Sequence, residues 1–395
     1  MLLPYCILLH IIIFSQYVSA QNSTLFYNIQ RTLIDSGFTL PDKHDIVLIS
    51  DEKQLYLVDF RNAGSTGGYI SVTPYDTNLV PGNEIKYSSL TKDFVDIKEI
   101  YRVADVLLRG DTLFVLFAKN IFIFPERKLP PEIITLKTDC SKLEVYRDGV
   151  ALFLNHNPST MSSKDLGRVY YLDKKLEFKQ IKQFAHSDIY LMYFNKPNYF
   201  EVMDEKILFL HAGEPALSIY DPNEHNSTEI TFLDTAKWTS FSHSQKDEFT
   251  KLAAKDKPNK IFSEVSPHLD RFLSYNLRID RLDSSRFLIT YSPGEKTSEK
   301  NFQLNQIVIT YDDESGYSIG SEYSYNFFNF YKSPDFNFSN KNKLRFCYLK
   351  GIRYELVLEP HASWHDRDAE RIQEEQNQSL LNDNYDLCIY SARVR

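Results

Sequence analysis

The chain has 395 residues, a formal net charge of −8 at pH 7, 43% hydrophobic residues and 25% charged residues. This composition excludes a mainly disordered chain, and the acidic balance argues against a nucleic-acid partner, because neutralising phosphates requires a basic face. Aromatic residues are abundant, with 26 Tyr and 28 Phe against 13 Gly. Since aromatic side chains favour half-buried pleated surfaces, the composition favours β structure.

The first twenty residues have the pattern of a removable export signal. An apolar run over residues 7–14 is followed by Val18, Ser19 and Ala20, which place small residues before Gln21 at a signal-peptidase site. The run is too short for a membrane span of about 20 residues, although it also lacks a starting Lys or Arg, and an uncleaved anchor is the alternative. We predict a signal peptide over 1–20, one domain over 21–395, export to the periplasm or the extracellular space, and no membrane span after cleavage.

Six units of similar pattern follow along the chain. Each contains two short apolar runs separated by a polar turn, and most have a third run. This pattern is typical of strand, tight turn and strand. The units cover residues 46–58, 105–124, 143–172, 200–220, 277–310 and 344–358.

The turns within these units have hairpin chemistry. Arg109-Gly110-Asp111, Arg147-Asp148-Gly149 and Lys350-Gly351 contain the Gly and Asp residues that tolerate the positive φ of tight hairpin turns. The strands after these turns are almost continuously apolar, which indicates burial on both faces, as in sheets that stack against other sheets.

Six units over the mature chain leave roughly 60 residues each, whereas a propeller blade needs about 40 to 50. The surplus is expected in insertions. Two of these have helical signals: Ser244 as a cap for a helix that ends before Pro258, and Ser363 as a cap for a helix over 366–383. The insertions are 60–68, 156–168, 222–270, 292–303 and 360–383.

The six units resemble the blades of six-bladed β-propellers of the TolB-like type, in particular the exported bacterial propellers of that group. The resemblance implies an all-β, six-bladed β-propeller with short helical insertions, whose loops line a central funnel. A seven- or eight-bladed propeller is the alternative. No catalytic residue is carried over, because such families share no active site.

Three cysteines remain after residue 20, namely Cys140, Cys347 and Cys388. None has the C-x-x-C spacing of zinc or redox sites. Cys347 and Cys388 both lie in strand-like runs and could form a disulfide in an exported protein. The preferred interpretation is three buried thiols that act as small hydrophobic side chains.

Several motifs suggest chemistry but lack the context that the chemistry requires. Residues 316–320 match the G-x-S-x-G of serine hydrolases, but they precede an alternating aromatic stretch that predicts a strand instead of a helix. His361 and His365 have helical spacing, yet Ala362 stands where zinc proteases have Glu. His211 and Glu214 follow a buried strand and could belong to a ligand loop, although a structural turn is the simpler interpretation. We predict no metal, cofactor or catalytic residues.

These observations favour an exported, non-enzymatic β-propeller that binds a protein, a glycan or another ligand through its loop face. Aromatic residues in the insertions, among them Trp238, would suit recognition or would face the core. Enzymatic activity stays open. The alternative is a hydrolase or lyase that acts on polysaccharide or a lactone, with acidic residues converging on the propeller axis from several blades. Four N-x-Ser/Thr sequons begin at Asn22, Asn226, Asn337 and Asn377 and have meaning in a eukaryotic secretory pathway.

Overall fold

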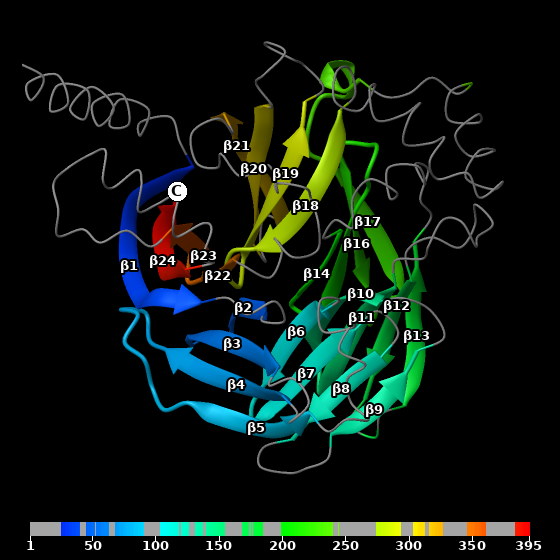
Figure 1. Cartoon of the computed structure of the whole chain (residues 1–395). Helices are drawn as coiled ribbons and strands as arrows, with labels where there is room; N and C mark the ends of the chain where they lie inside the picture. Colours follow the sequence, from blue (N-terminus) through cyan, green and yellow to red (C-terminus); the bar gives the residue numbers. More distant parts are fainter. Residues whose placement is uncertain are drawn as a thin grey trace, which may run out of the picture.

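The chain forms a six-bladed β-propeller (Figure 1). The computed structural model describes residues 25–39, 45–51, 53–62, 68–90, 103–117, 120–125, 131–136, 140–154, 168–173, 175, 177–184, 199–239, 244, 274–293, 303–312, 316–326, 346–360 and 384–395. These residues form six sheets of four strands, and within each sheet all neighbours are antiparallel. The predicted fold class is confirmed, and the seven- and eight-bladed alternatives are excluded.

Five blades take their strands from consecutive segments, the first strand being innermost. Blade 1 contains β2 (Asp45–Ser50), β3 (Leu55–Asn62), β4 (Gly68–Tyr75) and β5 (Ile85–Leu90); blade 2 contains β6 (Val103–Arg109), β7 (Thr112–Phe117), β8 (Asn120–Phe124) and β9 (Glu132–Thr135); blade 3 contains β10 (Cys140–Tyr146), β11 (Gly149–Leu154), β12 (Arg168–Leu172) and β13 (Phe178–Gln183). Blade 4 contains β14 (Phe200–Met203), β15 (Lys206–Leu210), β16 (Ala216–Asp221) and β17 (Asn226–Thr231); blade 5 contains β18 (Tyr275–Arg281), β19 (Arg286–Ser292), β20 (Gln303–Asp312) and β21 (Gly316–Asn326).

Blade 6 joins the two ends of the chain. Its three inner strands are β22 (Phe346–Leu349), β23 (Ile352–Pro360) and β24 (Asn384–Val394), and its outermost strand is β1 (Phe26–Thr39). The pairing of β1 with β24 runs from Phe26 opposite Val394 to Thr39 opposite Asn384. Figure 1 shows the blue N-terminal strand beside the red C-terminal one. The ring is therefore closed by hydrogen bonds between the first and last strands of the fold.

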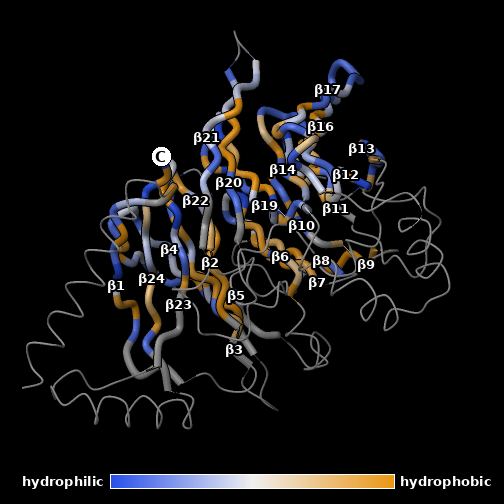
Figure 2. Tube along the Cα trace, turned by 90° about the horizontal axis from the view of Figure 1, so that it is seen from above, coloured by the Kyte–Doolittle hydropathy of each residue, from blue (hydrophilic) through white to orange (hydrophobic). Residues whose placement is uncertain are grey.

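The core lies between neighbouring blades. Val115 and Leu116 on adjacent positions of β7 are both fully buried, and so are Leu208 and Phe209 on β15. Because adjacent residues of a strand point to opposite faces, both faces of these sheets are covered, as the continuous apolar runs predict. Outer strands such as β17 are mostly hydrophilic (Figure 2).

The turns between the first and second strands of blades 2, 3 and 6 contain residues with the expected positive φ. Gly110 has φ +56°, Arg147 has φ +50°, and Lys350 and Gly351 have φ +51° and +72°. The turn at Arg147-Asp148-Gly149 uses its glycine differently, because Arg147 takes the positive φ while Gly149 permits close packing. A Cβ on Gly149 would lie 2.1 Å from the carbonyl oxygen of Leu172 on β12.

Helical structure is sparse in the described part of the chain. It contains one short 3-10 helix, Thr235–Lys237, capped by Asp234. The helices predicted after Ser244 and Ser363 fall almost wholly outside the described residues. The 222–270 segment is less of an insertion than expected, because it contains β17, the outer strand of blade 4.

Candidate functional site

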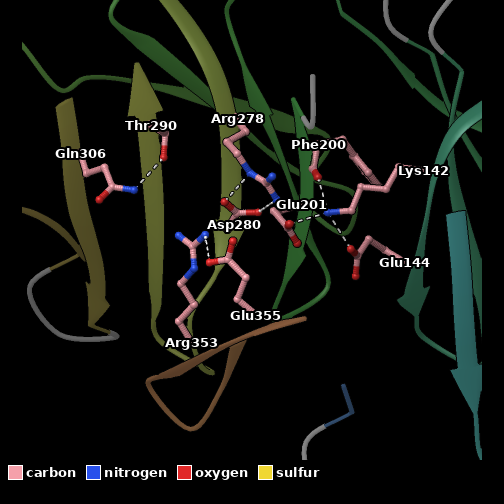
Figure 3. Close-up of polar contacts among 10 residues, drawn as sticks. All are labelled: Lys142, Glu144, Phe200, Glu201, Arg278, Asp280, Thr290, Gln306, Arg353 and Glu355. Atoms are coloured by element: carbon pink, nitrogen blue, oxygen red, sulfur yellow. Dashed lines mark hydrogen bonds and ion pairs between the residues drawn. The ribbon is translucent and has the colours of Figure 1, made fainter. Parts of the chain in front are cut away.

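Charged side chains gather along the inner strands of blades 3 to 5. Three of them are acidic and occupy equivalent positions, each pairing with the third residue of the next strand in its blade. The pairs are Glu144 with Ala151, Glu201 with Leu208, and Asp280 with Leu288. Together with two cations on these strands and one ion pair from blade 6, they form what we call the inner-strand charge cluster: Lys142, Glu144, Glu201, Arg278, Asp280, Arg353 and Glu355 (Figure 3).

A repeated backbone irregularity positions a charge on three inner strands. The pairing register slips immediately before Asp105 on β6, Lys142 on β10 and Arg278 on β18. A β-bulge re-aims the side chain that follows it. Each of the three residues pairs with the fifth residue of the next strand, so the bulge recurs at one place in the blade.

Lys142 is the central cation of the cluster. Its ammonium lies 2.7 Å from Glu144 Oε1, donates to the carbonyl oxygen of Phe200 at 2.9 Å, and forms an ion pair with Glu201. The side chains of Lys142 and Glu201 are 9% and 6% exposed. Blades 3 and 4 are thus joined by a buried, fully hydrogen-bonded ammonium.

The pKa values of this pair follow from burial and neighbouring charges. Burial alone would lower the pKa of the Lys142 ammonium, but the carboxylates of Glu144 and Glu201 more than offset burial and raise it. Burial raises the pKa of the Glu201 carboxyl to about 7; Glu144 and Asp280 add to this effect, and Lys142 opposes it. Because this pKa exceeds the unfolded value, ionisation of Glu201 with rising pH opposes folding.

Blades 5 and 6 are joined by a second set of charges. Arg278 donates from Nε to Asp280 Oδ2 at 2.6 Å and makes a second bond to the same carboxylate, while Arg353 donates to Glu355 Oε2 at 2.9 Å. Both guanidinium groups lie on the Phe346 ring, 4.1 and 4.3 Å from its centroid. Such cation–π contacts strengthen when they are shielded from water.

The charged groups of the cluster form ion pairs with one another. Each of its four carboxylates has a Lys or Arg partner. Glu201 has the pKa of a general acid near neutrality, but its buried carboxylate is bonded to Lys142. The geometry therefore resembles a charged joint between blades more than a set of carboxylates that converge on a substrate.

Asp105 makes an analogous joint between blades 2 and 3 through backbone N–H groups. One carboxylate oxygen accepts from the backbone N–H of Val106 at 3.0 Å, and the other accepts from that of Leu143 on β10 at 2.7 Å. Sequence reasoning missed this residue and the whole cluster. A partial signal exists for Glu144, Glu201 and Asp280, each of which is an acid one or two residues before the last residue of its strand.

His211 and Glu214 lie in the turn between β15 and β16. The backbone of this turn is held from two sides. Asn276 of blade 5 donates its side-chain amide to the carbonyls of His211 and Glu214 at 2.6 and 2.7 Å, and Trp238, which follows the 3-10 helix after blade 4, donates from Nε1 to Gly213 at 2.8 Å. His211 Nε2 lies 2.7 Å from Ser218 Oγ, and the Glu214 side chain is exposed. Trp238 is buried, so it serves the core and not a recognition surface.

The G-x-S-x-G segment is part of a strand. Gly316 is the first residue of β21, where it takes φ +76° and pairs with Asp312, and Ser318 pairs with Thr310 on β20. The nucleophile of a serine hydrolase requires a strand-to-helix turn, so the predicted hairpin and outer strand are confirmed. His361 and His365 lie outside the described residues.

The described cysteines, Cys140, Cys347 and Cys388, are present as thiols. Cys347 pairs with Tyr354 and Cys388 with Val357, so β23 lies between the two and separates them by about two strand spacings of 4.8 Å. A disulfide requires Cα atoms within about 7 Å, and the sheet does not bring these two together. Burial raises the pKa of the Cys347 thiol to about 12.

We therefore expect three titratable thiols per mature chain in denaturant under non-reducing conditions, and slow reaction of Cys347 in the folded protein at pH 8. A chromophoric disulfide that reacts with thiols measures both the number of thiols in denaturant and the rate of reaction in the folded protein. A count of one thiol after unfolding would show that Cys347 and Cys388 are bridged.

Among the residues that the structure describes, no group of three or more His, Cys, Asp or Glu side chains is arranged to hold a metal ion. Within the same residues no helix has the length and apolar character to cross a membrane.

No family model matches the chain, and no curated protein sequence matches it. Several solved structures resemble the chain at low identity. A Bacteroides fragilis protein that is thought to be exported is 10% identical, covers 93% of this chain and 95% of its own, and has a TM-score of 0.45. A luciferin-regenerating enzyme is 9% identical with 93% and 95% covered and a TM-score of 0.39. The WD40 domain of Neurospora crassa Pan2 is 8% identical with 70% and 64% covered and a TM-score of 0.36. At these values no activity, ligand or partner follows for this chain.

Proposed function

We propose that the chain is an exported β-propeller that binds a macromolecular partner or ligand and does not catalyse a reaction. The observation that carries the proposal is the pairing within the inner-strand charge cluster. The four carboxylates on or near the inner strands are held by Lys142, Arg278 and Arg353. These carboxylates stabilise the joints between blades, which leaves the loops at the ends of the ring for recognition. The six blades and the closing N-terminal strand also support the proposed TolB-like type.

We place the binding surface at the end of the ring that carries the β15–β16 turn. Glu214 is exposed there on a backbone that Asn276 and Trp238 hold in place. A turn that is already ordered loses little conformational entropy on binding. His211 and Glu214 are thus the described residues that we assign to the ligand loop, with Glu214 as the charged contact.

The export part of the proposal rests on residues 1–20. Cleavage before Gln21 would leave a short segment ahead of β1, which begins at Phe26. The mature protein would then start close to the strand that closes the ring, in the periplasm or the extracellular space.

A charge-reversal pair tests the binding surface. Glu214 and Glu224 are both exposed and lie in the turns at opposite ends of β16 (Ala216–Asp221). The tagged mature chain is used to capture protein partners from the exported fraction of the native cells, and it is also applied to a glycan array. We expect Glu214→Lys to weaken capture about tenfold, or ~1.4 kcal/mol, and Glu224→Lys to leave it unchanged. Equal capture by both variants, or a purified monomer that binds nothing and turns over a substrate, would contradict the proposal.

A further inference from the structure

The turn between β16 and β17 presents a glycosylation sequon on the surface. Asn226, Ser227 and Thr228 form an N-x-Thr sequence at the start of β17, and every residue from 223 to 229 is exposed. The other three sequons, at Asn22, Asn337 and Asn377, lie outside the described residues. Asn226 is therefore the sequon whose surroundings the structure defines.

The local geometry suits an attached sugar. Asn226 closes the hairpin opposite Asp221, and Thr228 lies opposite Ile219. Residues two apart on a strand project to the same face, so the Asn226 amide and the Thr228 hydroxyl are on one side of β17. The Asn226 Nδ2 atom donates to the exposed Glu224 Oε2 at 2.6 Å, and a glycan there would displace no core contact.

The position of β17 gives a glycan a physical role. This strand is the outer edge of blade 4, with β16 as its single neighbour, and exposed edge strands are prone to pair with other chains. The edge strand of blade 3 has Lys179 and Lys182 against such pairing, whereas β17 has the sequence NSTEIT with no Lys or Arg. A branched hydrophilic sugar at Asn226 would block the approach of a second strand.

We propose that Asn226 carries an N-linked glycan, which it receives during passage through a eukaryotic-type secretory pathway. In the transfer, Asn226 Nδ2 forms a bond to the anomeric carbon of a sugar, and the bond from that carbon to the phosphate of a lipid-diphosphate-linked oligosaccharide breaks. The lipid diphosphate leaves, and the amide proton is lost to the medium. This inference rests on the extracellular form of the proposed export, because the co-reactant faces the secretory lumen and a periplasmic protein does not meet it.

The test expresses the full chain in insect cells and maps the secreted protein. Trypsin releases residues 207–237 as one peptide that contains a single sequon. Treatment with peptide N-glycosidase in heavy-oxygen water should convert Asn226 to a labelled Asp in this peptide. We expect Asn226→Gln and Thr228→Ala each to remove one glycan from the secreted protein, and Ser227→Ala, which preserves the sequon, to retain it.

The possible outcomes distinguish failure of the glycan proposal from failure of the export proposal. A secreted chain that begins at Gln21 and has unmodified Asn226 overturns the glycan and leaves export intact. A chain that retains its first twenty residues inside the cell overturns both. Mapping of the wild-type peptide needs no variant, so a substitution that impairs folding does not affect this result.

Discussion

Replacing Lys142 with Met should destabilise the protein by about 3 to 5 kcal/mol, because the change leaves buried carboxylates without their cation. The Lys142 side chain is 9% exposed and serves both Glu144 and Glu201. Methionine fills a similar volume, so the loss would come from the charges and not from a cavity. Urea unfolding followed by tyrosine and tryptophan fluorescence measures the change through the midpoint at constant slope.

Two further variants make this prediction specific. Lys179 lies in the same blade and pairs with Asp173 at 3.4 Å, but its side chain is 63% exposed, so Lys179→Met should leave the midpoint almost unchanged. The double variant Lys142→Met with Glu201→Met removes the more deeply buried of the two stranded carboxylates and leaves Glu144, which is 22% exposed, so it should recover much of the lost stability. A Lys142→Met protein as stable as the wild type would show that the cluster does not join the blades.

The sequence predicts the blades well because their signal is local. A buried strand, a tight turn and a second buried strand follow one another within about fifteen residues, and the turn residues are the ones that the backbone needs. Gly110 and Gly351 take the expected positive φ. The same locality explains the correct assignment of Gly316 to a hairpin that leads into β21.

The charge cluster could not be predicted because its members meet only in the closed ring. Lys142 and Glu201 come from different blades, and Glu201 is the single charge in its short strand β14. Only the comparison of equivalent positions reveals that Glu144, Glu201 and Asp280 repeat. The placement of β1 was missed for a related reason, since its partner strand β24 lies at the other end of the chain.

The largest effect is expected from removing the strand that closes the ring. A mature chain that starts at residue 40 lacks β1, and β24 then has an unpaired edge along its length. The deletion also removes Leu25, which is 2% exposed and packs with Leu282 and Leu288 of blade 5. We expect the loss to exceed the 5 to 15 kcal/mol that stabilises a typical domain, so this chain should show no cooperative thermal transition.

Supplying β1 as a separate peptide tests whether its absence causes the loss of stability. A synthetic peptide of residues 25–39 should restore a cooperative transition whose midpoint rises with peptide concentration, as expected when a ligand binds only the folded state. A peptide of the same composition in scrambled order is the control, since it cannot reproduce the register from Phe26 to Thr39. A truncated chain that melts cooperatively at the wild-type temperature without peptide would show that the ring does not depend on closure by β1.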